Sequence, residues 1–369
     1  MSALLDLAKY GQSYWLDDLS RRMIENGELK RRVTEDGLGG VTDNPAIFNA
    51  ALTSSDDYDE SIRQYAGQHA NHIYETLIVA DVRDACDILR PVYARTEGRD
   101  GFVSLEVSPQ LARDAPGSIV EARRLWKAVD RPNLFIKIPG TPEGVPAIET
   151  LLIEGININV TLLFSIESYE AVAHAYVRAL ERRKAQQEPV DRLASVASFF
   201  LSRIDTLVDE KLQARAKLGD AVAKNLLGKC AIANAKLAYQ RFKETIASTR
   251  WKELERAGAV PQRLLWASTS TKNPAYHDLM YVEPLIGPQT VNTLPAKIIE
   301  AFADHGKTAA TLEQDIKEAW QATVDLKKTG IDYSHVANQL LEEGIDKFKK
   351  AYAETLQAIT NKAPLASVR

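Results

Sequence analysis

The chain has 369 residues, of which 45% are hydrophobic and 26% are charged, and its formal net charge is −4. This length allows one large domain or two of ordinary size, and the small negative charge leaves no basic surface for nucleic acid. No apolar run approaches the roughly 18 residues of a membrane-spanning helix, and we expect no signal peptide. Cys86 and Cys230 are too few for a disulfide framework and fit a reducing compartment, so we expect a cytoplasmic protein.

Short apolar runs alternate along the chain with long amphipathic segments. The predicted strands fall at 14–18, 39–45, 102–109, 133–141, 158–165, 194–203, 263–270 and 279–287. Helical patterns such as 58–94 and 206–257 separate most of them. This alternation favours a parallel sheet, and about eight such units favour a (β/α)8 TIM barrel over an open, doubly wound sheet. We therefore expect one barrel domain over 1–369, with a helical insert at about 206–257 and C-terminal helices at about 296–361.

Lys137 stands inside the apolar run NLFIKIPGT (133–141), where a lysine is rare unless it has a partner or a function. Alternate residues of a barrel strand face the lumen, so Lys137 shares the lumenal face with Phe135, and Glu106 shares it with Phe102. The same face carries Asn159 and Thr161 in the fifth run, and Ser198 and Phe200 in the sixth. These polar residues fall near the C-terminal ends of their strands, where barrel enzymes place their active sites.

Asp17, Glu106 and Lys137 place three ionisable groups in three short strands. Burying them is costly unless they meet in one polar site. A desolvated amine attacks a carbonyl to give an iminium, while carboxylates transfer the protons of dehydration and carbon–carbon cleavage. Taken alone, Lys137 could instead reach solvent from a strand end or pair with a buried carboxylate.

Two further pairs of polar residues extend the candidate site, and each pair has a simpler alternative. Thr42 and Asn44, in GGVTDNP, share one face of a short strand that a proline ends. They could bind a ligand, or they could form an Asx or Ser/Thr turn. Asn159 and Thr161 could bind a ligand, or they could form a hydrogen-bonding pair within the sheet.

Charged residues beyond the strand ends allow two kinds of ligand. Arg203 and Lys272 each lie just past a predicted strand, and two cations at the mouth of a barrel suit a phosphate, although a lone surface cation is more often solvated. His69, His72 and Glu75 have helical spacing, which makes a metal site conceivable. An exposed helix face explains that spacing more simply, so we expect no metal.

The segments YWLDDLSR, GVTDNPAIF, VSLEVSP, LFIKIPGTPEG, INVTLLFS and SFFLSRID resemble, in this order, the successive barrel-strand motifs of transaldolase. The resemblance runs from about Tyr14 to the TLP at 293–295 and implies that Lys137 is the Schiff-base lysine. It makes Asp17 and Glu106 the acid/base carboxylates, with Glu106 acting through a water that Thr161 helps to place. It also implies a set of substrate-binding residues: Thr42, Asn44, Asn159, Ser198, Phe200, Arg203 and Lys272.

The resemblance also implies which part of the substrate each of these residues contacts. Asn44 and Asn159 would hold hydroxyls, Ser198 the dihydroxyacetone end, and Arg203 the phosphate, while Phe200 lines the site. Lys272 would be the second phosphate ligand. Its segment, WASTSTKNP, is longer than the AS-aromatic-Arg/Lys form of many relatives. The long stretch around 206–257 resembles a longer subgroup of the family.

The resemblance implies a transaldolase of the non-oxidative pentose phosphate pathway, which moves a dihydroxyacetone unit from sedoheptulose 7-phosphate to glyceraldehyde 3-phosphate. No metal or organic cofactor is implied, because the lysine iminium accepts the electrons. The expected partners are sugar-phosphate substrates, without nucleic acid or membrane, and the chain would be a monomer or a homodimer. Three alternatives stay open: a lysine-dependent aldolase that releases free dihydroxyacetone, a glycosidase using Glu106 and Asp17, and a non-catalytic sugar-phosphate-binding protein.

Overall fold

Eight parallel strands close into a barrel in the computed structural model, which describes residues 3–363. Each strand pairs with its neighbours in chain order, and β1 pairs with β8 to close the ring. The predicted (β/α)8 barrel is therefore confirmed. The strands are β1 (Gln12–Asp17), β2 (Gly40–Thr42), β3 (Phe102–Glu106), β4 (Leu134–Pro139), β5 (Ile158–Leu163), β6 (Ser195–Phe200), β7 (Arg263–Ala267) and β8 (Thr290–Leu294).

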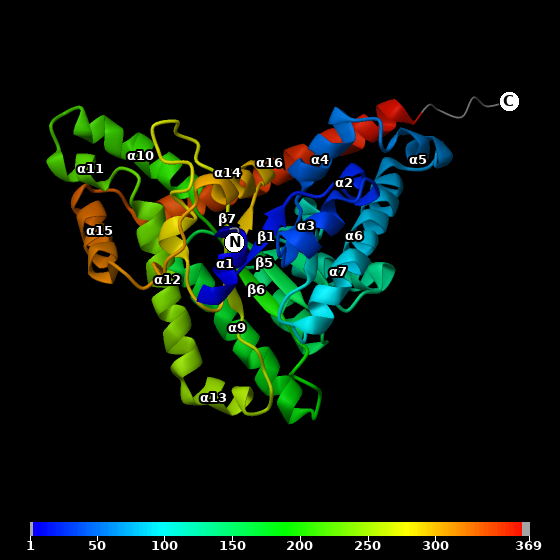
Figure 1. The fold of residues 1–369 in the computed structure, drawn as a ribbon, viewed down its shortest axis with the longest axis horizontal. Helices are drawn as coiled ribbons and strands as arrows, with labels where there is room; N and C mark the ends of the chain where they lie inside the picture. The colour runs from blue at the N-terminus through cyan, green and yellow to red at the C-terminus, as the bar shows by residue number, and fades with distance from the viewer. Residues whose placement is uncertain (1–2, 364–369) are drawn as a thin grey trace.

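Helices surround this barrel on the outside (Figure 1). The first half of the chain contributes α1 (Ala3–Asp6), α2 (Arg21–Glu25), α3 (Glu28–Glu35), α4 (Pro45–Ser54), α5 (Asp59–Gln64), α6 (Ala70–Arg95), α7 (Ala115–Val129) and α8 (Gly144–Ile153). The second half contributes α9 (Ile166–Ala185), α10 (Ser202–Ala216), α11 (Ala221–Leu226), α12 (Cys230–Ala247), α13 (Thr249–Glu255), α14 (Ala296–His305), α15 (Ile316–Lys328) and α16 (Tyr333–Lys362). Short 3-10 turns η1 (Leu7–Tyr10), η2 (Pro109–Leu111) and η3 (Glu283–Leu285) complete the order. Among the described residues, no helix is both long and apolar enough to cross a membrane.

The prediction of a strand at 279–287 is wrong. This segment forms turns and η3, and the eighth strand is β8, which lies further along the chain. Pro284 cannot donate to a sheet ladder, while Leu279, Val282 and Leu285 are buried without one. The apolar residues of this segment are buried, but they do not pair as a strand. The true strand, TVNTL, was missed because its polar residues interrupt the apolar pattern that the prediction relied on.

The predicted helix over 58–94 is two helices, α5 and α6, separated by a turn that contains Gly67. Gly67 has a φ of +90°, a backbone conformation that favours glycine and that a continuous helix does not contain. The segment 206–257 likewise consists of four helices, α10 to α13, between β6 and β7. Helical periodicity indicated these elements, but it did not reveal the breaks between them.

Aromatic side chains fill the barrel lumen towards the N-terminal ends of the strands. The rings of Phe102 and Phe135 stack with centroids 4.2 Å apart, and Trp15 lies 6.1 Å from Phe135. The Trp15 indole donates a 2.6 Å hydrogen bond to Asp100, and the neighbouring Arg263 lies 3.8 Å from that carboxylate. This floor confirms the lumenal face predicted for Phe102 and Phe135. It separates the C-terminal end of the barrel from a cavity of about 790 Å³ at the N-terminal end, which Trp15, Phe102 and Phe135 also line.

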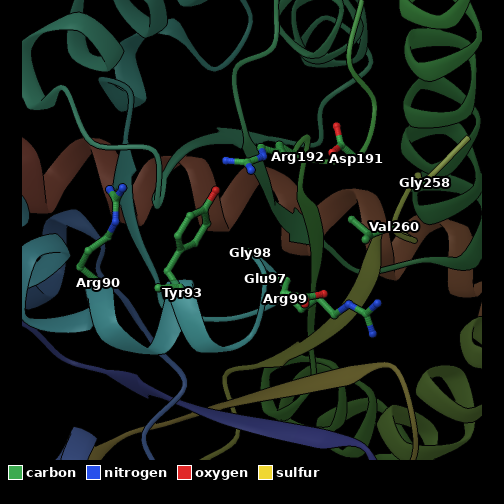
Figure 2. A pocket seen from close by; sticks show the side chains of 10 residues that line it. Arg90, Tyr93, Glu97, Gly98, Arg99, Asp191, Arg192, Gly258 and Val260 are labelled. Carbon is green, nitrogen blue, oxygen red and sulfur yellow. The ribbon is translucent and has the colours of Figure 1, made fainter.

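A cavity of about 560 Å³ lies outside the barrel, beside the N-terminal ends of β3, β6 and β7 (Figure 2). Arg90, Tyr93, Arg99 and Arg192 line it, together with Asp191. It contains none of the predicted site residues. Because barrel enzymes use the opposite, C-terminal face for chemistry, the candidate site has to be sought there.

Replacing Phe135 by alanine tests the aromatic floor. A fully buried phenylalanine leaves a cavity, so Phe135→Ala should lower the free energy of unfolding by about 3–5 kcal/mol. Val120→Ala on α7 is the matched control, because Val120 is 64% exposed and its truncation should cost less than about 0.5 kcal/mol. Urea titration followed by circular dichroism measures both, and equal losses would contradict the packing described here.

Candidate active site

A second cavity of about 560 Å³ opens at the C-terminal ends of the strands. All of the predicted site residues line it except Glu106 and Asn159, which lie in the barrel beneath it. The predicted residues in the lining are Asp17, Thr42, Asn44, Lys137, Thr161, Ser198, Phe200, Arg203 and Lys272. Predicted residues from six different segments of the chain thus converge on one space, as the common polar face of the strands predicted.

Lys137 lies at the bottom of this cavity on β4, paired in register with Glu106 on β3. Its Nζ is 3.1 Å from Oε2 of Glu106 and donates a 2.9 Å hydrogen bond to the backbone oxygen of Asp43. Both side chains of the ion pair are about 5% exposed or less. The centre of the Phe348 ring is 5.8 Å from the amine. Lys137 therefore pairs with a buried carboxylate and also faces the cavity, where a carbonyl could reach it.

The two carboxyl groups of the site have different surroundings. Burial raises the pKa of Glu106, and the neighbouring Lys137 ammonium opposes that rise. Burial also raises the pKa of Asp17, against the charge of Lys137 and a 2.9 Å hydrogen bond from the Thr42 hydroxyl. A carboxyl group with a raised pKa holds its proton to higher pH, which suits general acid–base chemistry near neutrality.

Four polar atoms at the site are buried and have no hydrogen-bond partner among the described residues: Oε1 and Oε2 of Glu106, Oγ1 of Thr161 and Nη1 of Arg203. Of these, Oε2 of Glu106 has the ion pair with Lys137. Buried polar atoms normally have partners, and unsatisfied ones cost about 1–3 kcal/mol each. Glu106 and Thr161 are suited to a water between them, while the Arg203 guanidinium is suited to an anionic ligand.

Asn159 and Ser198 form a hydrogen-bonded row across the lumen. Nδ2 of Asn159 donates to the Ser104 hydroxyl at 3.0 Å, and the Ser198 hydroxyl donates to Oδ1 of Asn159 at 2.7 Å. Asn159 is fully buried, so its amide holds Ser198, and Ser198 in turn lines the cavity. The partners of Asn159 are thus Ser104 and Ser198, not Thr161 on its own strand.

Asn44 forms the turn that its sequence allowed, and both Thr42 and Asn44 line the cavity. Asn44 caps α4, with its side-chain oxygen accepting from the backbone nitrogens of Ala46 and Ile47 at 3.0 and 3.3 Å. This is an Asx turn, and it leaves the amide nitrogen for the cavity. The Thr42 hydroxyl bonds to Asp17 and also lies 2.6 Å from the Thr293 hydroxyl.

Arg203 and Lys272 meet at the rim of the cavity. Arg203 begins the first turn of α10, with its guanidinium carbon 5.3 Å from the Phe200 ring centre, and burial lowers its pKa. Nζ of Lys272 donates to the Ser270 hydroxyl at 2.8 Å. Burial, and then the charge of Arg203, lower the pKa of Lys272. Two cations that destabilise one another across a cavity are suited to an anion between them.

Two tyrosine–aspartate contacts hold the segment that carries Lys272. Between β7 and β8, Tyr276 donates to Asp209 at 2.6 Å and Tyr281 donates to Asp205 at 2.9 Å. Asp205 also accepts from the backbone nitrogen of Ala231 at 2.8 Å. Both aspartates lie on α10, the helix whose first turn contains Arg203. The same helix therefore carries Arg203 and anchors the segment that carries Lys272.

Several residues of the cavity had not been predicted. Ser268, Ser270 and Thr293 come from the strand ends. Asp43, between Thr42 and Asn44, does not line the cavity, but its backbone oxygen accepts a hydrogen bond from Lys137. Lys347 and Phe348 come from α16, far along the chain from every strand. No local pattern marks them, since an amphipathic helix has the same appearance wherever it packs.

His69, His72 and Glu75 do not converge on the cavity. His69 and His72 are exposed, and Glu75 pairs with Arg124. The positions of these three residues thus agree with the exposed helix face that the sequence analysis gave as the simpler explanation of their spacing.

Fold and site together define a (β/α)8-barrel enzyme whose buried lysine amine is paired with one carboxyl group, Glu106, in a cavity that a second, Asp17, also lines; this class is suited to imine chemistry on carbonyl compounds. The family model described as Transaldolase/Fructose-6-phosphate aldolase matches residues 14–359. A transaldolase of Trichodesmium erythraeum is 50% identical over 97% of this chain and 97% of its own, and one of Thiobacillus denitrificans is 48% identical over 97% and 100%. Transaldolase 2 of Nostoc punctiforme is 49% identical over 99% and 98%. The chain belongs to the transaldolase/fructose-6-phosphate aldolase family.

The buried Asp205 should make stability depend on pH. Burial, with the nearby charge of Asp209 adding to it, raises the pKa of Asp205 from 3.8 to about 7. The folded protein therefore binds this proton more tightly than the unfolded chain, and the resulting stabilisation is complete below pH 3.8 and is lost as the pH rises through about 7. Asp205→Asn, which keeps the shape without the charge, should remove that loss.

The measurement is the free energy of unfolding at about pH 5 and pH 8. Wild type should lose a few kcal/mol more than Asp205→Asn between these values, since one pKa unit corresponds to about 1.4 kcal/mol. The exposed Asp191, changed to asparagine, serves as the control and should follow wild type. Identical pH profiles for wild type and Asp205→Asn would contradict the burial of a titrating carboxyl group.

Proposed function

We propose that this protein is a transaldolase that works through a Schiff base on Lys137. It takes a dihydroxyacetone unit from a ketose phosphate such as sedoheptulose 7-phosphate and passes it to glyceraldehyde 3-phosphate. The observation that carries the proposal is the position of the amine: Lys137 is buried 3.1 Å from Glu106 at the bottom of a cavity whose rim carries Arg203 and Lys272. The relatives that bear the name transaldolase match this chain over nearly its whole length.

The chemistry follows from these groups. The amine of Lys137 adds to the C2 carbonyl, and the resulting carbinolamine loses water to give an iminium. Glu106 moves the protons of these steps through a water that Thr161 holds, which would give their orphaned oxygens a partner. Asp17 removes the proton of the C4 hydroxyl, the C3–C4 bond breaks, and its electrons pass to the iminium to form an enamine. An aldose leaves, and the reverse sequence on the acceptor completes the transfer.

The remaining polar residues bind the substrate in this proposal. Ser198 holds the dihydroxyacetone end, and Asn159 acts through Ser198, because both of its polar groups are already hydrogen-bonded. Asn44 offers its amide nitrogen to a substrate hydroxyl. Arg203 and Lys272 bind the phosphate, whose oxygens supply an acceptor for the orphaned guanidinium nitrogen.

The side chain that covers the Lys137 amine favours transfer of the dihydroxyacetone unit to an acceptor over its release as free dihydroxyacetone. Helix α16 places Phe348 next to Lys137, where an apolar ring hinders water from hydrolysing the enamine. An aldolase that releases free dihydroxyacetone is the second candidate, and the family description includes such an activity. We place the protein in the cytoplasm, because Cys86 and Cys230 are free thiols.

Trapping the imine tests the function. Fructose 6-phosphate with borohydride should label wild type at Lys137, as located by mass spectrometry, while Lys137→Met should neither label nor turn over. Loss of the covalent route should cost several orders of magnitude in kcat, as removal of a nucleophile does. The exposed Lys127→Ala is the control and should behave as wild type.

A Lys137→Met variant within tenfold of wild type, or a label on another lysine, would exclude this mechanism. The same preparation separates transfer from release: with erythrose 4-phosphate present it should form sedoheptulose 7-phosphate, and without an acceptor it should release little dihydroxyacetone. Abundant release would favour the aldolase.

Replacement of Asp17 and replacement of Glu106 should impair different steps of the reaction. Asp17→Asn should still form the iminium and be trapped by borohydride, but it should lose bond cleavage by about 10²–10⁴-fold. Glu106→Gln should slow formation of the iminium itself, so trapping becomes slow. Rapid-quench borohydride trapping of each variant measures the two rates, and the opposite pattern would reverse the assignments.

A further inference from the structure

Helix α16 forms part of the wall of the active site. It lies across one end of the barrel and packs against α4 (Figure 1). Gly344, Lys347 and Phe348 are spaced by three and four residues, so they lie on one face of the helix. Phe348 has its ring centre 5.9 Å from the Arg203 guanidinium, and Lys347 lines the same cavity as Arg203 and Lys272. That face of α16 is therefore turned towards the cavity.

Gly344 permits this close approach. A Cβ atom there would be 2.9 Å from a methyl carbon of Leu162 and 3.4 Å from Nη1 of Arg203. A larger residue would push the helix away from β5 and from the arginine. The helix backbone thus lies against the guanidinium that has an orphaned nitrogen, and the side chain of Lys347 begins one turn further along.

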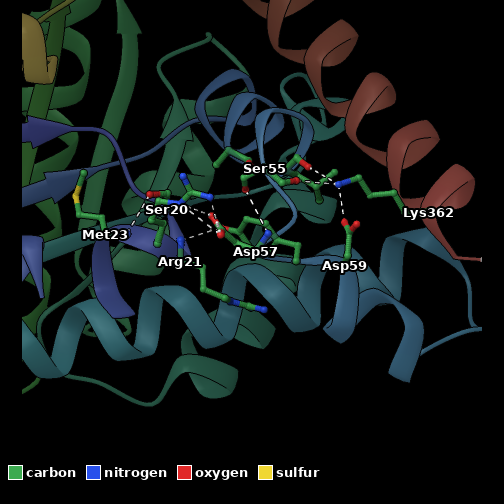
Figure 3. Close-up of polar contacts among 11 residues, drawn as sticks. Ser20, Arg21, Met23, Ser55, Asp57, Asp59 and Lys362 are labelled. Atoms are coloured by element: carbon green, nitrogen blue, oxygen red, sulfur yellow. Dashed lines mark hydrogen bonds and ion pairs between the residues drawn. The ribbon is translucent and has the colours of Figure 1, made fainter. Parts of the chain in front are cut away.

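Both ends of α16 are fixed to the body of the protein. Lys362 in its last turn donates to the backbone oxygens of Leu52 and Ser55, each at 3.0 Å, and to Asp59 at 2.6 Å (Figure 3). Tyr333 in its first turn donates to the backbone oxygen of Phe164 at 2.7 Å. These contacts make Lys347 part of a positioned wall and not of a free tail.

Glu343 balances the cations of this wall. Its Oε2 is 3.7 Å from Nζ of Lys347, and Gln339 donates to its Oε1 at 2.9 Å. Its charge also acts on Arg203. One carboxylate thus faces two of the cations around the cavity, and an incoming phosphate dianion would compete with it for both.

We propose that Lys347 is a third cationic ligand of the substrate phosphate, beside Arg203 and Lys272, and that Glu343 is the resident counter-ion which the phosphate displaces. This inference rests on the proposed function, because it assumes that a sugar phosphate occupies the cavity. Lysine is a compact charge on a flexible four-carbon stem, so Lys347 can turn from Glu343 to the phosphate without movement of the helix. The helix then contributes to substrate affinity as well as to the exclusion of water.

The test compares two lysines of the same helix. Lys350 is 78% exposed, lies 4.0 Å from Glu354 and does not line the cavity, so Lys350→Ala removes an equal charge without removing the ligand. Lys347→Ala should raise KM for fructose 6-phosphate, and the inhibition constant of inorganic phosphate, about tenfold, with kcat nearly unchanged. Lys350→Ala should stay within about twofold for both.

Two further measurements distinguish binding from a structural role. The kcat/KM of Lys347→Ala for unphosphorylated fructose should equal that of wild type, since no phosphate is present. Glu343→Gln should bind inorganic phosphate about two- to fivefold more tightly than wild type, because the competing carboxylate is gone. Circular dichroism melting confirms that each variant is folded.

Equal effects of Lys347→Ala and Lys350→Ala, or an equal loss with fructose, would overturn the inference. So would unchanged phosphate binding in Glu343→Gln. Calorimetric titration with inorganic phosphate requires no turnover, and it therefore tests the inference even if wild type gives no borohydride-trapped adduct and the proposed function fails.

Discussion

The buried pair of Lys137 and Glu106 is the constraint around which this structure is arranged. An ammonium and a carboxylate taken out of water lose several kcal/mol of solvation each, and their attraction repays this only when the geometry is good and the remaining polar atoms have partners. Adjacent β3 and β4 put the two residues in register, and the Asp43 carbonyl accepts from the amine. Among the described residues, one oxygen of the Glu106 carboxylate has neither a hydrogen bond nor an ion pair, so the pair is incompletely satisfied. A substrate or a water molecule can bind to these unsatisfied atoms.

The barrel separates this polar end from an apolar one. Trp15, Phe102 and Phe135 pack against one another in the lumen below the site. Two of the seven non-glycine residues with a positive φ among the described residues lie at the open end of the barrel. Leu162 and Ser268 have φ of +60° and +55°, and they lie at or just past the C-terminal ends of β5 and β7. Non-glycine residues in this conformation cost of order 1–3 kcal/mol and persist where the surroundings hold them, as they do in functional sites.

The strained strand end at Leu162 is also where the C-terminal helix rests. Because Gly344 has no side chain, α16 can lie on Leu162 and bring Phe348 over both the amine and Arg203. A covalent enamine survives only if the acceptor aldehyde arrives before water does, and a fixed apolar cover serves that need. The cover over the amine and one wall of the cavity therefore come from one helix that follows all eight strands in the chain.

Much of the barrel and most of its candidate site could be predicted from the sequence, because both rest on local periodicity. Alternation within a strand is enough to put Lys137 and Phe135, or Glu106 and Phe102, on one face, and parallel strands bring their C-terminal ends together. The same reasoning failed at 279–287, where buried apolar residues without a ladder resemble a strand. Only the tertiary structure decided that Asn159 holds Ser198, that the Asp43 carbonyl holds the amine, and that Lys347 and Phe348 line the cavity. Periodicity determines which side of a helix is buried, but which surface it meets depends on packing between segments that are distant in the chain.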